Sequence, residues 1–176
     1  MADTFAACLA FTLQQEGGFS DDPNDPGGAT NYGITLGTLR SYIGNPNLGV
    51  PDIQNITMAT VQAIYQANYW NRMSCGALPD GVDLMTFDHG VNAGPGRSGT
   101  ILQQAAGLTG AAVDGGIGPQ TLAAVGQVDP ATLIASMAAL QRSYYQSLAN
   151  FALYGNGWLA RLDRRQASAT AMQAGT

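Results

Sequence analysis

The chain contains a single glutamate, Glu16, at a position that suits a catalytic acid. Glu16 follows Phe5 by eleven residues and Leu9 by seven, so in a helix the three side chains share one face. An apolar face disfavours the ionised carboxylate, and the protonated form is what a general acid needs to protonate a glycosidic oxygen. The alternative is that Glu16 only ends the helix, although a helix C-terminus disfavours an acid.

A second carboxylate is available in the turn-rich loop that follows, where Asp21, Asp22 and Asp25 lie. Paired carboxyl groups hydrolyse glycosides with inversion when they are about 6.5–9.5 Å apart and with retention at about 5–5.5 Å, and sequence spacing does not fix that distance. Turn-forming bonds are the competing role, which we expect for at least one of the three. A calcium loop is disfavoured because Gly33 stands where the bidentate glutamate belongs. We therefore expect neither a metal nor a cofactor.

Residues 16–35 form one motif, Glu-Gly-Gly-Phe-Ser-Asp-Asp-Pro-Asn-Asp-Pro-Gly-Gly-Ala-Thr-Asn-Tyr-Gly-Ile-Thr. This string closely resembles the signature of glycoside hydrolase family 108. Members of that family are N-acetylmuramidases found as phage endolysins and in bacterial secretion or lysis clusters. The resemblance implies that Glu16 is the essential catalytic residue. It also implies hydrolysis of the β-1,4 bond between N-acetylmuramic acid and N-acetylglucosamine in peptidoglycan.

The partner of Glu16 is indicated by a pattern seen in phage lysozymes, Glu-x8-Asp-x5-Thr. Glu16 and Asp25 match it, while Asn31 stands where the threonine would be and Thr30 lies one place early. Asp25 is therefore the preferred second carboxylate, as base or electrostatic stabiliser. We expect Thr30 or Asn31 to hold water or substrate.

The second half of the chain resembles the predicted peptidoglycan-binding region that follows this motif in the family. The matching elements include Asn92-Ala93-Gly94 and residues 113–122, which read Val-Asp-Gly-Gly-Ile-Gly-Pro-Gln-Thr-Leu. The second element is also a turn followed by a helix start, so a folding role competes with a role in lining a groove.

Aromatic and polar side chains supply further candidates. Tyr69, Trp70 and Trp158 suit stacking on sugar faces, although core packing is the competing role. His89 is the only histidine, and a structural role is favoured over a catalytic one. The substrate-binding candidates are Asn31, Tyr32, Asp22, Trp70 and Asn92.

Composition excludes some classes of partner. Seven arginines, no lysine and twelve acids give a net charge of -5, which opposes nucleic-acid binding. We expect Cys8 and Cys75 to be buried thiols. The N-terminus has neither the basic start of a signal peptide nor a membrane span, so we expect synthesis in the cytoplasm and action in the periplasm or cell wall, with a holin or another export factor providing the route.

Hydrophobic periodicity predicts a mainly α, lysozyme-like fold with a short hairpin or turn-rich loop after the first helix. We expect a catalytic part over residues 1–80 and a helical peptidoglycan-binding region over 81–176, packed as one compact monomer. The expected helices cover residues 3–15, 36–43, 57–69, 80–91, 98–106, 120–125, 130–153 and 158–166, followed by a frayed tail. A short strand or hairpin is expected at 30–35.

These features together predict a muramidase that acts on peptidoglycan glycan strands. Two alternatives stay open. A lytic transglycosylase would break the same bond without water and leave an anhydro sugar, and a wall-binding or secretion-accessory protein would cut nothing.

Overall fold

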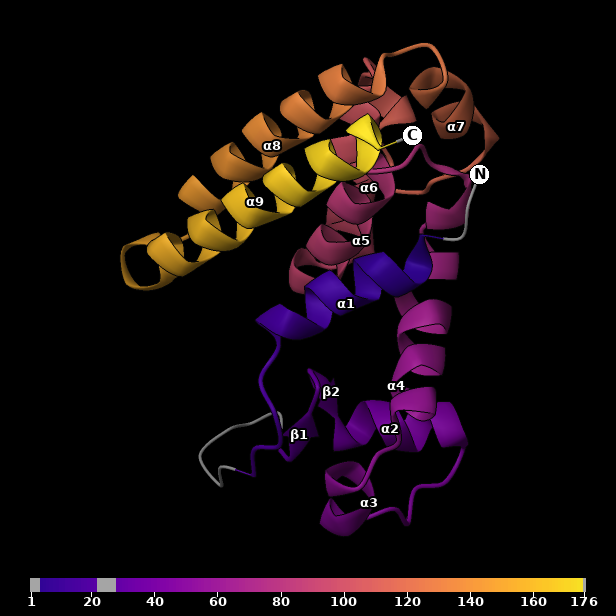
Figure 1. The fold of residues 1–176 in the computed structure, drawn as a ribbon, viewed down its shortest axis with the longest axis vertical. Helices are drawn as coiled ribbons and strands as arrows, with labels where there is room; N and C mark the ends of the chain where they lie inside the picture. Colours follow the sequence, from indigo (N-terminus) through magenta and orange to yellow (C-terminus); the bar gives the residue numbers. More distant parts are fainter. Residues whose placement is uncertain (1–3, 22–27, 176) are drawn as a thin grey trace. The chain divides into compact units, whose positions relative to one another are not determined.

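The computed structural model describes residues 4–21 and 28–175 and is mainly α-helical (Figure 1), as the periodicity predicted. The chain divides into two compact units, each described by itself. We call residues 9–68 the hairpin unit, and residues 1–8 together with 69–176 the helical unit. The functional division at residue 80 stays a prediction.

The hairpin unit begins within helix α1, Phe5–Gln15, whose first turn belongs to the helical unit. A short antiparallel hairpin follows, in which β1, Thr30–Asn31, pairs with β2, Ile34–Thr35. Helices α2, Leu36–Ile43, α3, Val50–Gln54, and α4, Met58–Tyr65, complete the unit (Figure 1), and the π-helix η1, Gln66–Asn71, continues from α4 across the unit boundary.

Local capping fixes the helix starts in this unit. The side chain of Thr35 accepts a hydrogen bond from the Thr38 amide at 3.1 Å, and that of Thr57 accepts one from the Thr60 amide at 3.2 Å. Gly44 ends α2 in the left-handed conformation, with φ of 73°. The core beneath is apolar; its most buried members are Leu9, Ile34, Leu39, Ile53, Val61, Ile64 and Tyr65.

The helical unit is built around α5, Val82–Ala93, in which residues 82–90 are all buried. Around it lie α6, Pro95–Ala105, α7, Pro119–Val125, α8, Pro130–Gln146, and α9, Phe151–Ala174, with the short 3-10 helices η2, Cys75–Ala77, and η3, Gly110–Ala112. Figure 1 shows α8 and α9 side by side, and α5 packs against α6, α8 and α9. Asp129 caps the start of α8, where its carboxylate accepts from the Thr132 amide at 2.9 Å, so this helix begins where the sequence predicts.

The end of the chain differs from the sequence expectation in two ways. The helix expected over 130–153 ends at Gln146, and a separate helix, α9, begins at Phe151. The sequence pattern did not reveal this break because its apolar residues continue through the connection. The tail expected to fray is helical to Ala174. Ala169 is completely buried there, and a Cβ on Gly81 would lie 2.3 Å from its carbonyl oxygen, so two small residues allow the close packing that holds this segment.

Cys8 and Cys75 are both buried free thiols, as expected, and burial raises the pKa of each well above its usual range. Among the described residues, no single helix is both long and apolar enough to cross a bilayer; α7 and α8 meet that test only as a pair bent by 112°.

Candidate active site

Glu16 is the first residue after α1 and lies against the turn of the hairpin. Its side chain is half-buried. A Cβ placed on Gly33 would lie 2.8 Å from Oε2 of Glu16 and 3.2 Å from its Cδ, so the carboxyl group rests directly on the backbone of this glycine. The same point is 2.8 Å from the hydroxyl oxygen of Tyr65. Glu16, Gly33 and Tyr65 therefore meet at one place in the hairpin unit.

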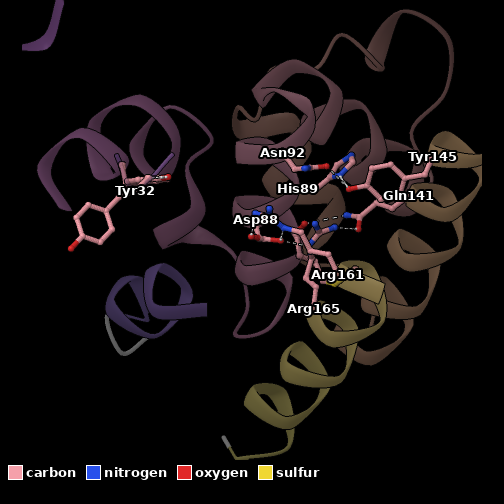
Figure 2. Close-up of polar contacts among 10 residues, drawn as sticks. Tyr32, Asp88, His89, Asn92, Gln141, Tyr145, Arg161 and Arg165 are labelled. Carbon is pink, nitrogen blue, oxygen red and sulfur yellow. Dashed lines mark hydrogen bonds and ion pairs between the residues drawn. The ribbon is translucent and has the colours of Figure 1, made fainter. Parts of the chain in front are cut away.

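The turn of the hairpin has an uncommon backbone. Tyr32 and Gly33 have φ of 51° and 71°, the positive pair of a type I′ turn, and a non-glycine residue is uncommon there. The hydroxyl of Tyr65, which is 2% exposed, donates to the carbonyl oxygen of Tyr32 at 2.8 Å. This bond from α4 holds the turn in place beneath Glu16, while the Tyr32 ring projects from it (Figure 2).

Thr30 and Asn31 secure β1 on both sides. The backbone of Thr30 exchanges two hydrogen bonds with Ser20, at 2.9 and 2.8 Å. The side-chain amide of Asn31 is buried and donates to the carbonyl oxygens of Ile53 at 3.2 Å and Gln54 at 3.1 Å. Asn31 thus anchors α3 to the hairpin, a positioning role that sequence reasoning did not assign.

The other candidates divide between the two units. Asp22 and Asp25 lie outside the described residues, so their roles stay predictions. Trp70 belongs to the helical unit, is 5% exposed, and packs against Phe5 and Phe87 with ring centroids 5.3 and 5.5 Å away. Its ring fills the core, the role that the sequence interpretation weighed against sugar stacking. Asn92, also in the helical unit, is exposed at the end of α5.

Two participants were missed in the sequence. Gly33 was noted only as a poor calcium ligand, and Tyr65 merely falls within the helix expected over residues 57–69. The Asn-Tyr-Gly turn was a usable signal for Gly33, since positive φ favours glycine. Nothing local marks Tyr65, whose hydroxyl acts on a residue 33 positions away.

A buried charged cluster joins three helices of the helical unit (Figure 2). Asp88 on α5 accepts from Arg161 at 3.1 and 2.7 Å and from Arg165 at 2.6 Å. Arg165 also donates to Gln141 on α8 at 2.6 Å, and Gln141 donates to the Met85 carbonyl at 3.1 Å. Burial alone would raise the pKa of Asp88, but Arg165 and Arg161 together hold it below its usual value. These bonds join α5, α8 and α9, so we assign the cluster a role in holding the three helices together.

His89 lies beside that cluster and is completely buried. The Tyr145 hydroxyl donates to Oδ1 of Asn92 at 2.9 Å and lies 3.1 Å from Nδ1 of His89, which leaves Nδ1–H as the donor to Tyr145. Burial, and then the Arg165 cation, lower the pKa of His89 to about 3, so the imidazole is neutral at neutral pH. The favoured structural role of His89 fits these contacts.

The loop after η3 is fixed by Gln103, which is 1% exposed. Its Nε2 donates to Oδ1 of Asp114 at 2.8 Å, to the carbonyl of Gly116 at 2.9 Å and to the Thr121 hydroxyl at 3.1 Å, and its Oε1 accepts from the Gly115 amide at 2.8 Å. The motif at 113–122 is thus a folding signature, in the sense that one buried amide organises the whole turn. Within residues 4–21 and 28–175, no group of three His, Cys, Asp or Glu side chains is arranged to hold a metal ion.

A mainly helical fold that sets an acidic side chain on a short hairpin defines a lysozyme-like protein. The chain belongs to the glycosyl hydrolase 108 family: the family model "Glycosyl hydrolase 108" matches residues 9–94, and "Predicted Peptidoglycan domain" matches residues 97–163. The chain is also similar to the solved structure of Brucella abortus SagA, with 35% identity over 98% of this chain and 97% of that chain and a TM-score of 0.85. No curated protein matches the sequence.

These matches confirm the resemblance read from residues 16–35 and from the second half of the chain. The protein is a glycoside hydrolase with a peptidoglycan-binding domain, and its function is peptidoglycan-lytic.

Proposed function

We propose that this protein is an N-acetylmuramidase that hydrolyses the β-1,4 bond between N-acetylmuramic acid and N-acetylglucosamine, with Glu16 as the general acid. The observation that carries the proposal is the contact of the Glu16 carboxyl group with the backbone of Gly33. A half-buried carboxyl group held by a shaped turn has a defined direction in which to deliver its proton.

In this mechanism the proton of Glu16 moves to the glycosidic oxygen as the bond from that oxygen to the anomeric carbon breaks. Water supplies hydroxide to the anomeric carbon and its remaining proton leaves to a base. We assign Asp25 as that base or as the electrostatic stabiliser of the charged transition state, with Thr30 placing the water. Gly33 and Tyr65 act as positioning residues, because they hold the turn on which Glu16 rests.

Exchange of Glu16 for Gln tests the acid, because it preserves shape and removes the proton. We expect digestion of purified peptidoglycan sacculi to slow by about 10²–10⁴-fold, the usual contribution of a general acid. Asp52→Asn is the matched control: it makes the same carboxyl-to-amide change on an exposed side chain of the same unit, and should digest at the wild-type rate. Equal digestion by wild type and Glu16→Gln would remove Glu16 from the mechanism.

Product analysis tests the bond and the reaction. After borohydride reduction, mass spectrometry should find muramic acid at the new reduced end. Reduced glucosamine there would place the cut at the other glycosidic bond. A product lacking one water would identify a lytic transglycosylase. No products at all would favour a wall-binding or secretion-accessory protein.

The second carboxylate needs its own variant. Asp25→Asn should lower turnover strongly while Asp21→Asn lowers it little, if Asp25 is the partner as the lysozyme pattern indicates. We further propose that the enzyme acts in the periplasm or cell wall, where its substrate lies. Detection of the protein in the periplasmic fraction of its host during lysis or secretion would test that location.

A further inference from the structure

The helical unit has an open polar groove whose lining includes one positively charged and one negatively charged side chain. Its cavity volume is about 370 Å³, and it is lined by Ala93, Gly96, Arg97, Thr100, Asp114 and Tyr144. These residues come from the junction of α5 and α6, from the loop after η3 and from α8. None of them belongs to the proposed hydrolytic residues.

The cation is the guanidinium of Arg97, which is exposed and held over the ring of Tyr144, with Cζ 4.9 Å from the ring centroid. Stacking on a ring face orients the guanidinium and leaves its N–H edge for a planar acceptor such as a carboxylate. In the part of the chain that the structure describes, Arg97 forms no ion pair.

The anion is the carboxylate of Asp114, which is set rigidly by the loop. The hydrogen bonds from Gln103 and from the Gly116 amide, both 2.8 Å, lower the pKa of Asp114, so it is ionised at neutral pH. The loop lies directly on α6, since a Cβ on Gly99 would be 2.0 Å from the Gly115 carbonyl oxygen. Asp114 also forms no ion pair within the described ranges.

An apolar hollow continues the groove. It has a volume of about 90 Å³, shares Ala93 and Tyr144 with the groove, and is completed by Asn92, Tyr145, Leu148 and Trp158. A ligand with two opposite charges and small apolar groups nearby would match the groove and the hollow together. Neutral sugar rings would leave both charges unanswered.

We propose that this groove binds the peptide stem of peptidoglycan through the zwitterionic end of a diamino acid, with its carboxylate on Arg97 and its ammonium on Asp114. The stem alanine methyl groups would occupy the hollow beside Trp158. Because the chain carries a net charge of -5 and the wall polymer is anionic, long-range attraction is weak, and a fixed local cation is needed to receive a stem carboxylate. The inference rests on the proposed function only in taking peptidoglycan as the ligand.

The test is a cycle of variants and ligands, measured by isothermal titration calorimetry on the full chain. The probe is the synthetic tripeptide L-Ala-γ-D-Glu-meso-diaminopimelate, together with one form amidated at the terminal side-chain carboxyl and one acetylated at the side-chain amine. Amidation of the ligand and Arg97→Gln should each weaken binding about tenfold or more, and together no further than either alone. Acetylation and Asp114→Asn should form a second such pair. Asp114→Asn keeps the acceptor for Gln103 and Gly116, so the loop is preserved.

Arg142→Gln is the control, since it removes one half-buried arginine of α8 outside the groove, where it pairs with Asp163. It should bind the tripeptide like wild type. Binding of the unmodified tripeptide that Arg97→Gln leaves unchanged would overturn the proposal, as would additive effects within either pair, because additive losses mean that the two groups do not touch.

A digestion assay separates this inference from the proposed function. With Glu16 intact, Arg97→Gln should slow digestion of intact sacculi but cleave glycan strands stripped of peptide at the wild-type rate. Loss of cleavage on both substrates would contradict the inference while leaving the muramidase proposal standing. If Glu16→Gln cleaved both substrates at the wild-type rate, the proposed function would instead be wrong.

Discussion

The carboxyl group of Glu16 lies where a side chain on residue 33 would have to be: a Cβ on Gly33 would stand 2.8 Å from its Oε2. Gly33 also has φ of 71°, so two independent constraints favour glycine at this position. The proposed acid is thereby oriented by the absence of a side chain beneath it.

Gly33→Ala should therefore lose more activity than stability alone explains. The left-handed backbone costs an alanine about 1–2 kcal/mol, and the new methyl also displaces Glu16 or Tyr65. We expect the rate of peptidoglycan digestion to fall about 100-fold, as for other small displacements of a catalytic group.

Gly44→Ala supplies the control, because Gly44 has φ of 73° and nothing within 4 Å of its added Cβ. Gly44→Ala should lower the free energy of unfolding measured in urea by the same backbone cost, and its turnover should stay at the wild-type value. If both variants kept full activity when folded, the contact between residue 33 and Glu16 would have no role in catalysis.

Tyr65→Phe should reduce both stability and turnover. It removes the hydroxyl that donates to the Tyr32 carbonyl, at a cost of about 1 kcal/mol in the free energy of unfolding, and loosens the turn that seats Glu16. We expect a roughly tenfold loss of turnover. Thr86→Val removes a completely buried hydroxyl of the helical unit, which donates to the Val82 carbonyl, and should not show this loss of turnover. Equal turnover in the two variants would contradict the positioning role of Tyr65.

Asp88→Asn should destabilise the fold by about 3–5 kcal/mol, because it leaves the buried Arg165 cation without a counter-charge. Arg161→Gln should cost less, since the Arg161 side chain is 12% exposed and Arg165 still pairs with Asp88. Chemical denaturation at pH 7 measures both. A milder effect of Asp88→Asn than of Arg161→Gln would show that the cluster is not held by its carboxylate.

Stability should fall as the solution is acidified from pH 6.5, because of His89. In the unfolded chain this histidine takes up a proton near its usual pKa of 6.5, whereas the folded protein keeps it neutral down to about 3. Unfolding therefore takes up a proton in this window, so the free energy of unfolding falls by up to about 1.4 kcal/mol per pH unit. Below about pH 4 the depressed pKa of Asp88 acts in the same direction.

His89→Asn should be less stable at pH 7 but should lack most of this dependence between pH 6.5 and 4. The measurement compares how steeply the free energy of unfolding changes with pH in the wild type and in His89→Asn. The comparison is needed because burial raises the pKa of Asp83, whose protonation on acidification stabilises both proteins and so opposes the effect of His89. His89 is the only histidine in the chain, so parallel slopes would mean that the imidazole is protonated in the fold.

The sequence by itself determined the features that depend on neighbouring residues. Helix starts at Thr57 and Asp129 were predictable because a cap bonds an amide three residues away. The hairpin at Thr30–Thr35 followed from its turn residues. Glu16 was identifiable because it is the only glutamate and because it begins one contiguous motif, and both features can be read directly from the sequence.

Only the tertiary structure decided which distant side chains support that acid and hold the helices together. Tyr65 reaches Tyr32 across 33 positions, and Asp88 reaches Arg165 across 77. The break before Phe151 and the helical course to Ala174 also depend on packing, in which a buried Ala169 meets Gly81. Periodicity reports which face of a helix is apolar, but it carries no information on the partner of that face or on where a polar side chain finds its bond, because those depend on contacts between segments far apart in the chain.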